Sequence, residues 1–402
     1  MSGWTTKKLG EVCVFLGDGD WIESKDQSSN GIRLIQTGNV GQGCFIPKEK
    51  NRHYVTEATF KRLNCTEIFA GDILISRLPE PVGRACIIPQ CNERMITAVD
   101  CSILRLHHSI CDEKYLVYYA SSAGWFSDVD AKCTGSTRKR ISRKNLQGIE
   151  IPIPPLAEQK RIVAKIDAAF EKIDRLKANA EKNLTNAKEL FQSALDEAMR
   201  PKTGWVEKRL GEVANIRVGP FGSSLHKADY VDNGVPLVNP CHMKDSKIAD
   251  RISTQVSHDK AESLKEYRLK AGDIVFARRG EIGRLAFVSE KEDGYLCGTG
   301  SLFARFRERY DIQFLYFFFS SKSFVERLEL LSTGTTMKSI NSSALESMSF
   351  SVPPMNDQQR LAKQLDSLSQ KTKALQQNYA QQIADCAEMR QAILREAFEG
   401  RM

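Results

Sequence analysis

Positively charged residues gather after Thr134-Gly135, in a stretch that could bind a polyanion. Residues 131–147 contain no acidic side chain. The cluster consists of Arg138, Lys139, Arg140, Arg143 and Lys144. Clustered Arg and Lys beside small hydroxyl residues suit a phosphate backbone, because they displace its condensed counterions. A solvated loop explains the same charge equally well, so both interpretations stay open.

A related loop at residues 333–343 begins with Thr333-Gly334 but carries Lys338 as its only charged side chain. We therefore expect the two loops to touch different surfaces. Other polar residues could read base edges in a major groove. The candidates for guanine edges are Arg77, Arg278 and Arg279, and the candidates for adenine edges are Gln36, Asn39 and Asn239. Some of these residues are expected to serve packing or turns instead.

Catalytic motifs are nearly absent from the sequence. No Gly-x-x-x-x-Gly-Lys-Ser/Thr phosphate loop occurs. An adenine methyltransferase needs an Asn/Asp-Pro-Pro-aromatic loop, and the nearest match, residues 239–242, has one proline and no aromatic residue. A metal nuclease of the Pro-Asp and Glu-x-Lys type is disfavoured, because no Pro-Asp dipeptide occurs. The chain is therefore interpreted as non-catalytic, and a DNA-modifying enzyme with an unrecognised active site is kept as an alternative.

The chain repeats itself over a long period. Residues 4–12 return as residues 205–213, and residues 70–73 return as residues 271–274. Each copy is large enough to bury its own core, so the repeat is not a solenoid of short units. In each copy, β-branched and alternating runs broken by Gly, Asn and Pro predict short strands, and a short helix follows them. Each copy is thus expected to be a mixed α/β body.

Long helical patterns follow the proline pairs Pro154-Pro155 and Pro353-Pro354. Apolar residues recur there at alternating spacings of four and three, which indicates helices that pack along their length. The residues expected in this seam are Ile162, Ile166, Ile173, Leu176, Leu184 and Phe191 in the first helix, and Leu361, Leu365, Leu368, Leu375, Ile383 and Ile393 in the second. Proline suits a first helical turn and opposes helix before itself, so it supplies each start. The alternative is a pair of amphipathic helices that each cover their own domain.

The predicted fold class is α+β, with two similar mixed α/β domains joined by two long antiparallel helices that form a coiled coil. The expected boundaries are 1–155 for the first domain, 156–200 for the central helix, 201–354 for the second domain and 355–402 for the C-terminal helix. Residues 400–402 fall where residues 201–203 stand in the first copy, so the chain ends where a third copy would begin. This predicts a pseudo-two-fold circular arrangement.

The bulk composition fits such a protein. The 402 residues are 41% hydrophobic and 27% charged, which leaves room for two globular domains. The formal net charge of +8 leans toward a polyanionic partner. The eleven cysteines include no Cys-x-x-Cys pair, which favours free thiols in a reducing cytoplasm. No apolar run approaches the roughly twenty residues of a membrane helix, so no membrane partner is expected.

These motifs together resemble the specificity subunits of type I restriction-modification systems, commonly called HsdS. The resemblance rests on the repeated start at residues 4–12 and 205–213, on residues 31–40, on residues 152–162 and on the closing residues 394–400. It covers the chain from end to end. The single motifs are loose, but their order and duplication are specific.

The resemblance implies two target recognition domains, each reading half of a split and asymmetric DNA site, with the helices acting as a ruler that sets the unread spacer. The implied partners are double-stranded DNA, two modification subunits that methylate adenine, and two restriction subunits that translocate and cut. S-adenosylmethionine, ATP and Mg2+ would be held by those partners, and no cofactor or metal by this chain. A coiled-coil scaffold that never touches DNA is the remaining alternative.

Overall fold

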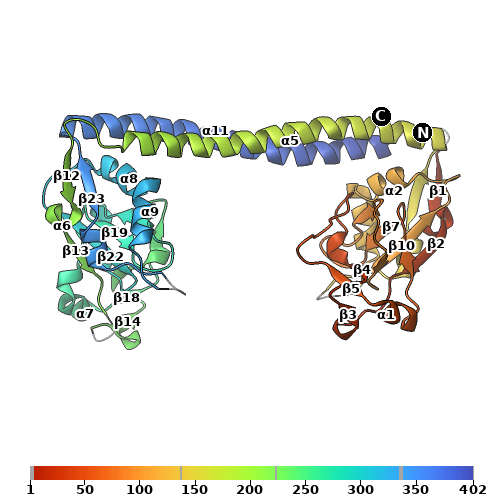
Figure 1. Ribbon diagram of the computed structural model, residues 1–402, viewed down its shortest axis with the longest axis horizontal. Coiled ribbons are helices and arrows are strands. Elements are labelled where there is room, and N and C mark those ends of the chain that lie inside the picture. Colours follow the sequence, from red (N-terminus) through yellow and green to blue (C-terminus); the bar gives the residue numbers. More distant parts are fainter. Residues whose placement is uncertain (1–3, 136–137, 222–223, 335–337, 402) are drawn as a thin grey trace. The chain divides into compact units, whose positions relative to one another are not determined.

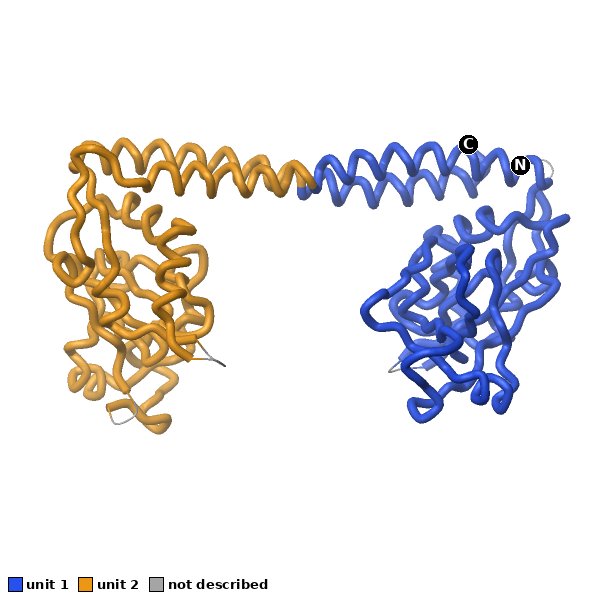
Figure 2. The backbone as a smooth tube through the Cα atoms, in the orientation of Figure 1, with its two compact units in different colours: residues 1–181, 380–402 blue, residues 182–379 orange. Residues whose placement is uncertain are grey.

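The computed structural model describes residues 4–135, 138–221, 224–334 and 338–401. These residues form two compact units, coloured separately in Figure 2: unit 1 comprises residues 1–181 and 380–402, and unit 2 comprises residues 182–379. Each unit contains one copy of the repeat and segments of two long helices. The copy at residues 4–153 is called head 1, and the copy at residues 205–352 is called head 2.

Head 1 is built on three sheets (Figure 1). The first sheet has the order β2 (Cys13–Asp18), β10 (Cys101–Leu106), β7 (Ile73–Ser76), β8 (Ala85–Ile87), and all its pairs are antiparallel. The second has the order β3 (Gln27–Ser28), β5 (His53–Val55), β4 (Ile32–Ile35), β9 (Met95–Thr97), β6 (Glu67–Ile68). The third pairs β1 (Thr5–Lys8) with β11 (Glu150–Ile153). The α-helices are α1 (Glu57–Arg62), α2 (Glu113–Tyr119), α3 (Ala123–Ala131) and α4 (Arg143–Gln147).

Head 2 repeats this plan. Its first sheet has the order β13 (Ala214–Val218), β22 (Ser301–Phe306), β19 (Ile274–Ala277), β20 (Leu285–Phe287). The second has the order β14 (Tyr230–Val231), β18 (Gln255–Val256), β15 (Val235–Val238), β21 (Leu296–Cys297). The remaining pairs are β12 (Val206–Arg209) with β23 (Ser349–Val352) and β16 (Met243–Lys244) with β17 (Lys247–Ile248). The α-helices are α6 (Leu210–Val213), α7 (His258–Ser263), α8 (Ile312–Ser320), α9 (Lys322–Leu330) and α10 (Ser342–Glu346).

The first sheet of each head is buried on both faces. Successive side chains of a strand point to opposite faces, so one strand contributes to two cores. In β7, Ile73 and Ile75 belong to a core shared with α2, α3 and the long helices. Leu74, between them, belongs to the core shared with the second sheet. The central strands therefore read as continuous apolar runs, which is typical of strands covered on both sides.

The repeated Ala-Gly-Asp-Ile motif marks the start of a central strand. Asp72 Oδ2 accepts a hydrogen bond from the backbone N–H of Phe69 at 3.0 Å, and Asp72 pairs with Arg105 at 3.0 Å. Gly71 before it has φ +90°, a conformation that L side chains rarely adopt. The motif thus combines a turn that requires glycine with a carboxylate that holds the turn closed.

Two long helices, α5 (Leu156–Ala198) and α11 (Met355–Phe398), pass from one unit into the other. In unit 1 the start of α5 and the end of α11 share one core, which includes Ile166 and Leu394. In unit 2 the end of α5 and the start of α11 share another, which includes Leu195 and Leu365. Within each unit the helices therefore run antiparallel, and the predicted α+β fold with paired long helices is confirmed. A membrane-spanning helix is not found among the described residues, since none is both long and apolar enough.

Most of the residues expected in the seam between the long helices are buried or half-buried, and Ile162, Ile166, Leu361 and Leu365 lie in cores that the helices share with the heads. Buried members are Ile162, Ile166, Ile173, Leu361 and Leu365, and half-buried members are Leu184, Phe191, Leu368, Ile383 and Ile393. The prediction was wrong for Leu176 and Leu375, which are 54% and 41% exposed. At 3.6 residues per turn, Leu176 lies about 60° around the helix from buried Ile173, at the margin of the seam.

Candidate nucleic-acid interface

Three arginines of head 1 come together around two carboxylates. Arg77 follows β7, and Arg140 and Arg143 belong to the basic loop, defined as residues 138–144, whose last two residues begin α4. Arg77 Nη2 lies 3.5 Å from Asp18 Oδ1, and Arg143 Nη1 lies 3.8 Å from Asp18 Oδ2. Arg140 Nη2 lies 3.0 Å from Asp100 Oδ1. The positive charge of this cluster is therefore partly neutralised inside the head.

Arg77 is the most buried member of this cluster. Its side chain is 5% exposed, whereas those of Arg140 and Arg143 are 44% and 50% exposed. Arg77 Nη2 also donates a hydrogen bond to the carbonyl oxygen of Val99. Burial lowers the pKa of Arg77, and the nearby Asp18 opposes that shift by favouring the charged form. We therefore correct the prediction that Arg77 reads a guanine edge: the side chain serves the fold.

The rest of the basic loop faces solvent. Arg138 and Lys144 are exposed, and neither forms an ion pair with another described residue. Lys139 Nζ lies 2.6 Å from Asp130 Oδ1, with both side chains exposed. Residues 136–137, inside the loop, lie outside the described residues. Arg138 and Lys144 thus stay the clearest candidates for phosphate contacts in head 1.

The corresponding surface of head 2 contains Arg278, Arg279 and Lys338. Arg279 forms an isolated β-bridge with Ser339, which brings the two chain segments together. The guanidinium of Arg278 lies over the ring of Phe221, 4.8 Å from its centroid. The structure thus brings the chain segment of Lys338 beside Arg279, although the two come from distant parts of the sequence, and the Lys338 side chain pairs with Glu329 at 3.7 Å. Residues 335–337 of this loop lie outside the described residues.

Phe221 is a candidate that the sequence reasoning missed. It follows Gly219 at two residues, as Trp21 follows Gly19, and both aromatic residues are exposed, at 49% and 68%. The two glycines are equivalent in the fold. The backbone N–H of Gly19 donates to the carbonyl of Cys101, which begins β10, and that of Gly219 donates to the carbonyl of Ser301, which begins β22. A shared aromatic residue after a glycine was a signal in the sequence, and it places one exposed ring on each head.

The amide side chains proposed for adenine edges are used inside the heads. Asn39 Oδ1 accepts from the backbone N–H of Gln36 at 2.9 Å, and Asn39 Nδ2 donates to the carbonyl of Ile46 at 2.8 Å. Asn239 Oδ1 accepts from the backbone N–H of Gly300 at 3.4 Å. Asn39 therefore holds a turn, and we replace its predicted base contact with that role, whereas the base contact of half-buried Asn239 stays a prediction. Gln36 is half-buried and begins the turn that Asn39 closes.

His242 gives head 2 a pH-dependent version of the Asn39 turn. Its Nδ1 accepts the backbone N–H of Asn239 at 3.1 Å, and burial lowers the pKa of the ring. Because the folded pKa lies below the unfolded value of about 6.5, this stability is complete above pH 6.5 and is lost as pH falls through the folded pKa. We expect the free energy of unfolding of unit 2 to decline below pH 6.5 by up to about 1.4 kcal/mol per pH unit.

The matched control for this pH effect is His242→Asn, which installs the residue that unit 1 uses. Asn39 makes the same hydrogen bond without titrating. Urea denaturation between pH 5 and 8 should show that His242→Asn removes the decline attributed to this ring. An equal decline in both proteins would show that other groups cause it.

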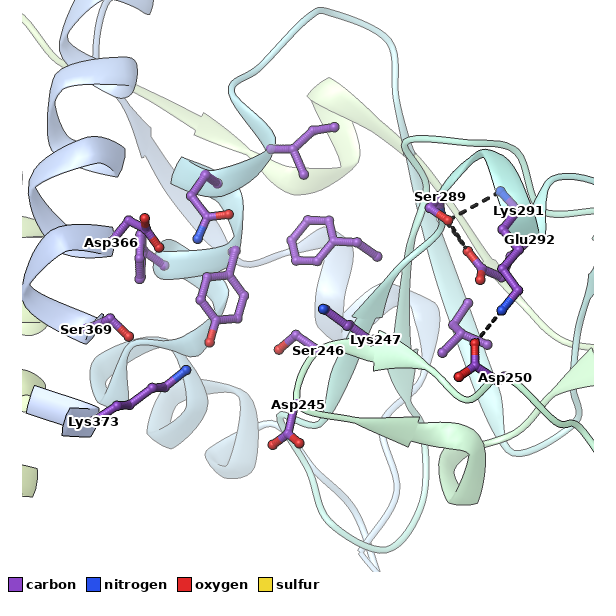
Figure 3. A pocket seen from close by; sticks show the side chains of 16 residues that line it. Asp245, Ser246, Lys247, Asp250, Ser289, Lys291, Glu292, Asp366, Ser369 and Lys373 are labelled. Carbon is purple, nitrogen blue, oxygen red and sulfur yellow. Dashed lines mark hydrogen bonds and ion pairs between the residues drawn. The ribbon is translucent and has the colours of Figure 1, made fainter. Parts of the chain in front are cut away.

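A cavity of about 590 Å³ lies between head 2 and α11 (Figure 3). Lys247, Lys291 and Lys373 line it, but so do carboxylates such as Glu292 and Asp366. Lys291 is paired with a carboxylate in the same wall. This mixed charge does not suit a polyanion, so the arginine surfaces are the better candidates for DNA.

Comparison with known proteins finds relatives of this chain. The EcoBI type I restriction enzyme specificity subunit of Escherichia coli is 22% identical over 311 residues, which cover 71% of this chain and 65% of that protein. The chain thus spans slightly less than two thirds of that relative. The StySPI specificity subunit of Salmonella potsdam is 23% identical, over 100% of this chain and 89% of that protein.

The fold has a solved counterpart. A chain from a structure of complex assembly in a type I R-M system superposes with a TM-score of 0.79 at 21% identity, covering 100% of this chain and 99% of that one. A family model for the type I restriction modification DNA specificity domain matches residues 1–186 and 202–384. Because both copies of the repeat match that model, this chain belongs to the family of type I restriction modification DNA specificity domains.

Proposed function

We propose that this chain reads a bipartite, asymmetric DNA site, with one half-site contacted by each head. The observation that carries the proposal is the duplicated specificity domain, whose copies are joined by continuous helices. The different arginine surfaces of the two heads support an asymmetric site. In head 1 the arginines share two carboxylates, whereas Arg278 and Arg279 of head 2 form no ion pair within the described chain.

The chain is proposed to act as the non-catalytic subunit of a larger complex in the cytoplasm. Its partners would be two modification subunits, which use S-adenosylmethionine to methylate adenine, and two restriction subunits, which use ATP and Mg2+. The names of the relatives, all specificity subunits of restriction enzymes, support this division of labour. Under this proposal the chain selects the DNA site and the partners supply the chemistry.

Exposed apolar residues on the long helices support two equivalent partner sites. In unit 1 Leu176 and Met389 are 54% and 48% exposed, and in unit 2 Leu190 and Leu375 are 54% and 41% exposed. Leu176 corresponds to Leu375 in the repeat, and Leu190 corresponds to Met389. Exposed apolar residues at repeated positions favour a partner that binds in two copies, since each copy would meet the same surface.

Lengthening both helices tests whether they set the spacing of the half-sites. One heptad inserted after Glu181 and one after Tyr379 keeps the seam in phase and adds about 10 Å to each helix. Co-expressed with its modification partner, the variant should methylate a site whose unread gap is longer by up to about three base pairs at 3.4 Å each. Genome-wide mapping of methylated adenines gives the half-sites and the gap together.

The control for this experiment is a heptad of the same composition inserted in a surface loop outside the helices, which should leave the gap unchanged. Unaltered spacing in the lengthened protein would contradict the ruler. The absence of any two-part motif with the natural chain would contradict the proposed function itself.

A further inference from the structure

Arg278 of head 2 and Arg77 of head 1 occupy the same place in the fold. Each follows the central strand of its first sheet, β19 and β7. The backbone N–H of Arg77 donates to the carbonyl of Asp100 at 2.8 Å, and that of Arg278 donates to the carbonyl of Gly300 at 2.9 Å. Differences around the two guanidinium groups therefore reflect side chains rather than backbone placement.

The carboxylates that accompany Arg77 have no counterpart beside Arg278. Asp18 ends β2, and Val218 ends the equivalent strand β13. Asp100, which contributes the second carboxylate, is replaced by Gly300. Over the residues that the structure describes, neither Arg278 nor the exposed Arg279 beside it forms an ion pair. The charge of Arg278 is thus not neutralised by its own head.

The guanidinium of Arg278 is held in place but keeps a free donor. Its Nε donates to the carbonyl of Ile340 at 3.2 Å, and its face lies on the ring of Phe221. Its Nη1 is buried and has no hydrogen-bond partner, and Nε of Arg77 in head 1 is in the same situation, so the missing carboxylate is what distinguishes Arg278. Burial and the charge of Arg279 lower the pKa of Arg278, and no carboxylate opposes them. A buried donor without an acceptor is unfavourable, so an acceptor that reaches Nη1 would remove that cost.

We propose that Arg278 is the specificity-determining residue of head 2 and pairs with a two-acceptor group of DNA, while Phe221 holds its guanidinium plane. This inference rests on the proposed function, because it requires head 2 to bind a half-site. The planar fork of arginine matches guanine O6 and N7, and it also matches phosphate oxygens. The guanine edge fits better, since the Phe221 ring and the hydrogen bond to the carbonyl of Ile340 fix the direction of the fork. In head 1 Asp18 already occupies the corresponding place.

The test introduces into head 2, at Val218, the carboxylate that Asp18 supplies in head 1. The natural complex with its modification partner is compared with Val218→Asp, with the neutral and nearly isosteric control Val218→Asn, and with Arg278→Ala and Arg278→Lys. Val218→Asp should lower methylation tenfold or more, because its carboxylate competes for Arg278, and Val218→Asn should stay near the natural level. Arg278→Ala should relax one guanine position of a single half-site, and Arg278→Lys should relax it too while keeping the charge.

The outcomes distinguish a guanine edge from a phosphate as the acceptor. They also distinguish failure of the Arg278 inference from failure of the proposed function. If the acceptor is phosphate, Arg278→Ala keeps the methylated motif but weakens binding to all sequences, and the slope of log affinity against log salt falls by about one. Continued reading of the other half-site shows that the variants fold. An unchanged motif in Arg278→Ala, with or without a change in the salt slope, would overturn the inference that Arg278 determines specificity. A natural complex without a two-part motif would instead overturn the proposed function.

Discussion

Replacement of Trp125 by alanine is expected to reduce the free energy of unfolding of unit 1 by about 3–5 kcal/mol. Trp125 is fully buried at the start of α3. Its Nε1 donates to the carbonyl of Gly83 at 2.9 Å, and its ring lies edge-on to Tyr119 with 6.0 Å between centroids. The alanine variant would lose this packing and leave both a cavity and an unpaired carbonyl. Urea denaturation gives the loss of free energy, and hydrogen exchange locates it in unit 1.

The repeat supplies the control for this experiment. Phe324 occupies the equivalent position at the start of α9, where it is 1% exposed and follows a capping serine as Trp125 does. Trp125→Phe should therefore cost about 1–2 kcal/mol, because it keeps an aromatic ring and loses chiefly the indole hydrogen bond. Equal losses for alanine and phenylalanine would mean that the hydrogen bond, rather than the packed volume, dominates.

Replacement of Asp72 by alanine is expected to cost about 3 kcal/mol of unfolding free energy in unit 1. Asp72 is 5% exposed and faces Arg105, whose side chain is 30% exposed. Removing the carboxylate leaves the guanidinium without its partner and the backbone N–H of Phe69 without its acceptor. Solvent reaches Arg105, so the loss should fall at the lower end of the range for broken buried pairs.

Asp72→Asn separates the two contributions of this carboxylate. The amide oxygen can still accept from Phe69, so we expect about half of the alanine effect, since only the charge is lost. Chemical denaturation of both variants gives the comparison. In unit 2, Asp273 makes the same pair with Arg305 at 2.7 Å, so Asp273→Ala should destabilise that unit in the same way. A loss of less than about 1 kcal/mol in either unit would contradict a stabilising role for the pair.

The candidate interface was only partly predictable from the sequence. The charges at Arg138 and Lys144 could be recognised, because a run of cations without acids is a local property. The role of Arg77 could not, because Asp18 and Val99 belong to distant segments that only folding brings near. The role of Asn39 depends on a local turn with Gln36 and Ile46, which its residue type alone did not reveal. Phe221 was missed because a single aromatic residue in a loop is common, and its contact with Arg278 spans distant segments.

The sequence by itself determined the duplicated plan, the mixed α/β heads and the two long helices, because repeats, proline pairs and apolar periodicity are written along the chain. Only the tertiary structure decided which of two equivalent arginines is neutralised. Asp18 at the end of β2 pairs with Arg77, and the charge of Asp100 also favours the charged form of Arg77, whereas Val218 and Gly300 leave Arg278 without a carboxylate. The availability of a charge depends on what lies within a few ångströms in space, and sequence spacing does not record those distances.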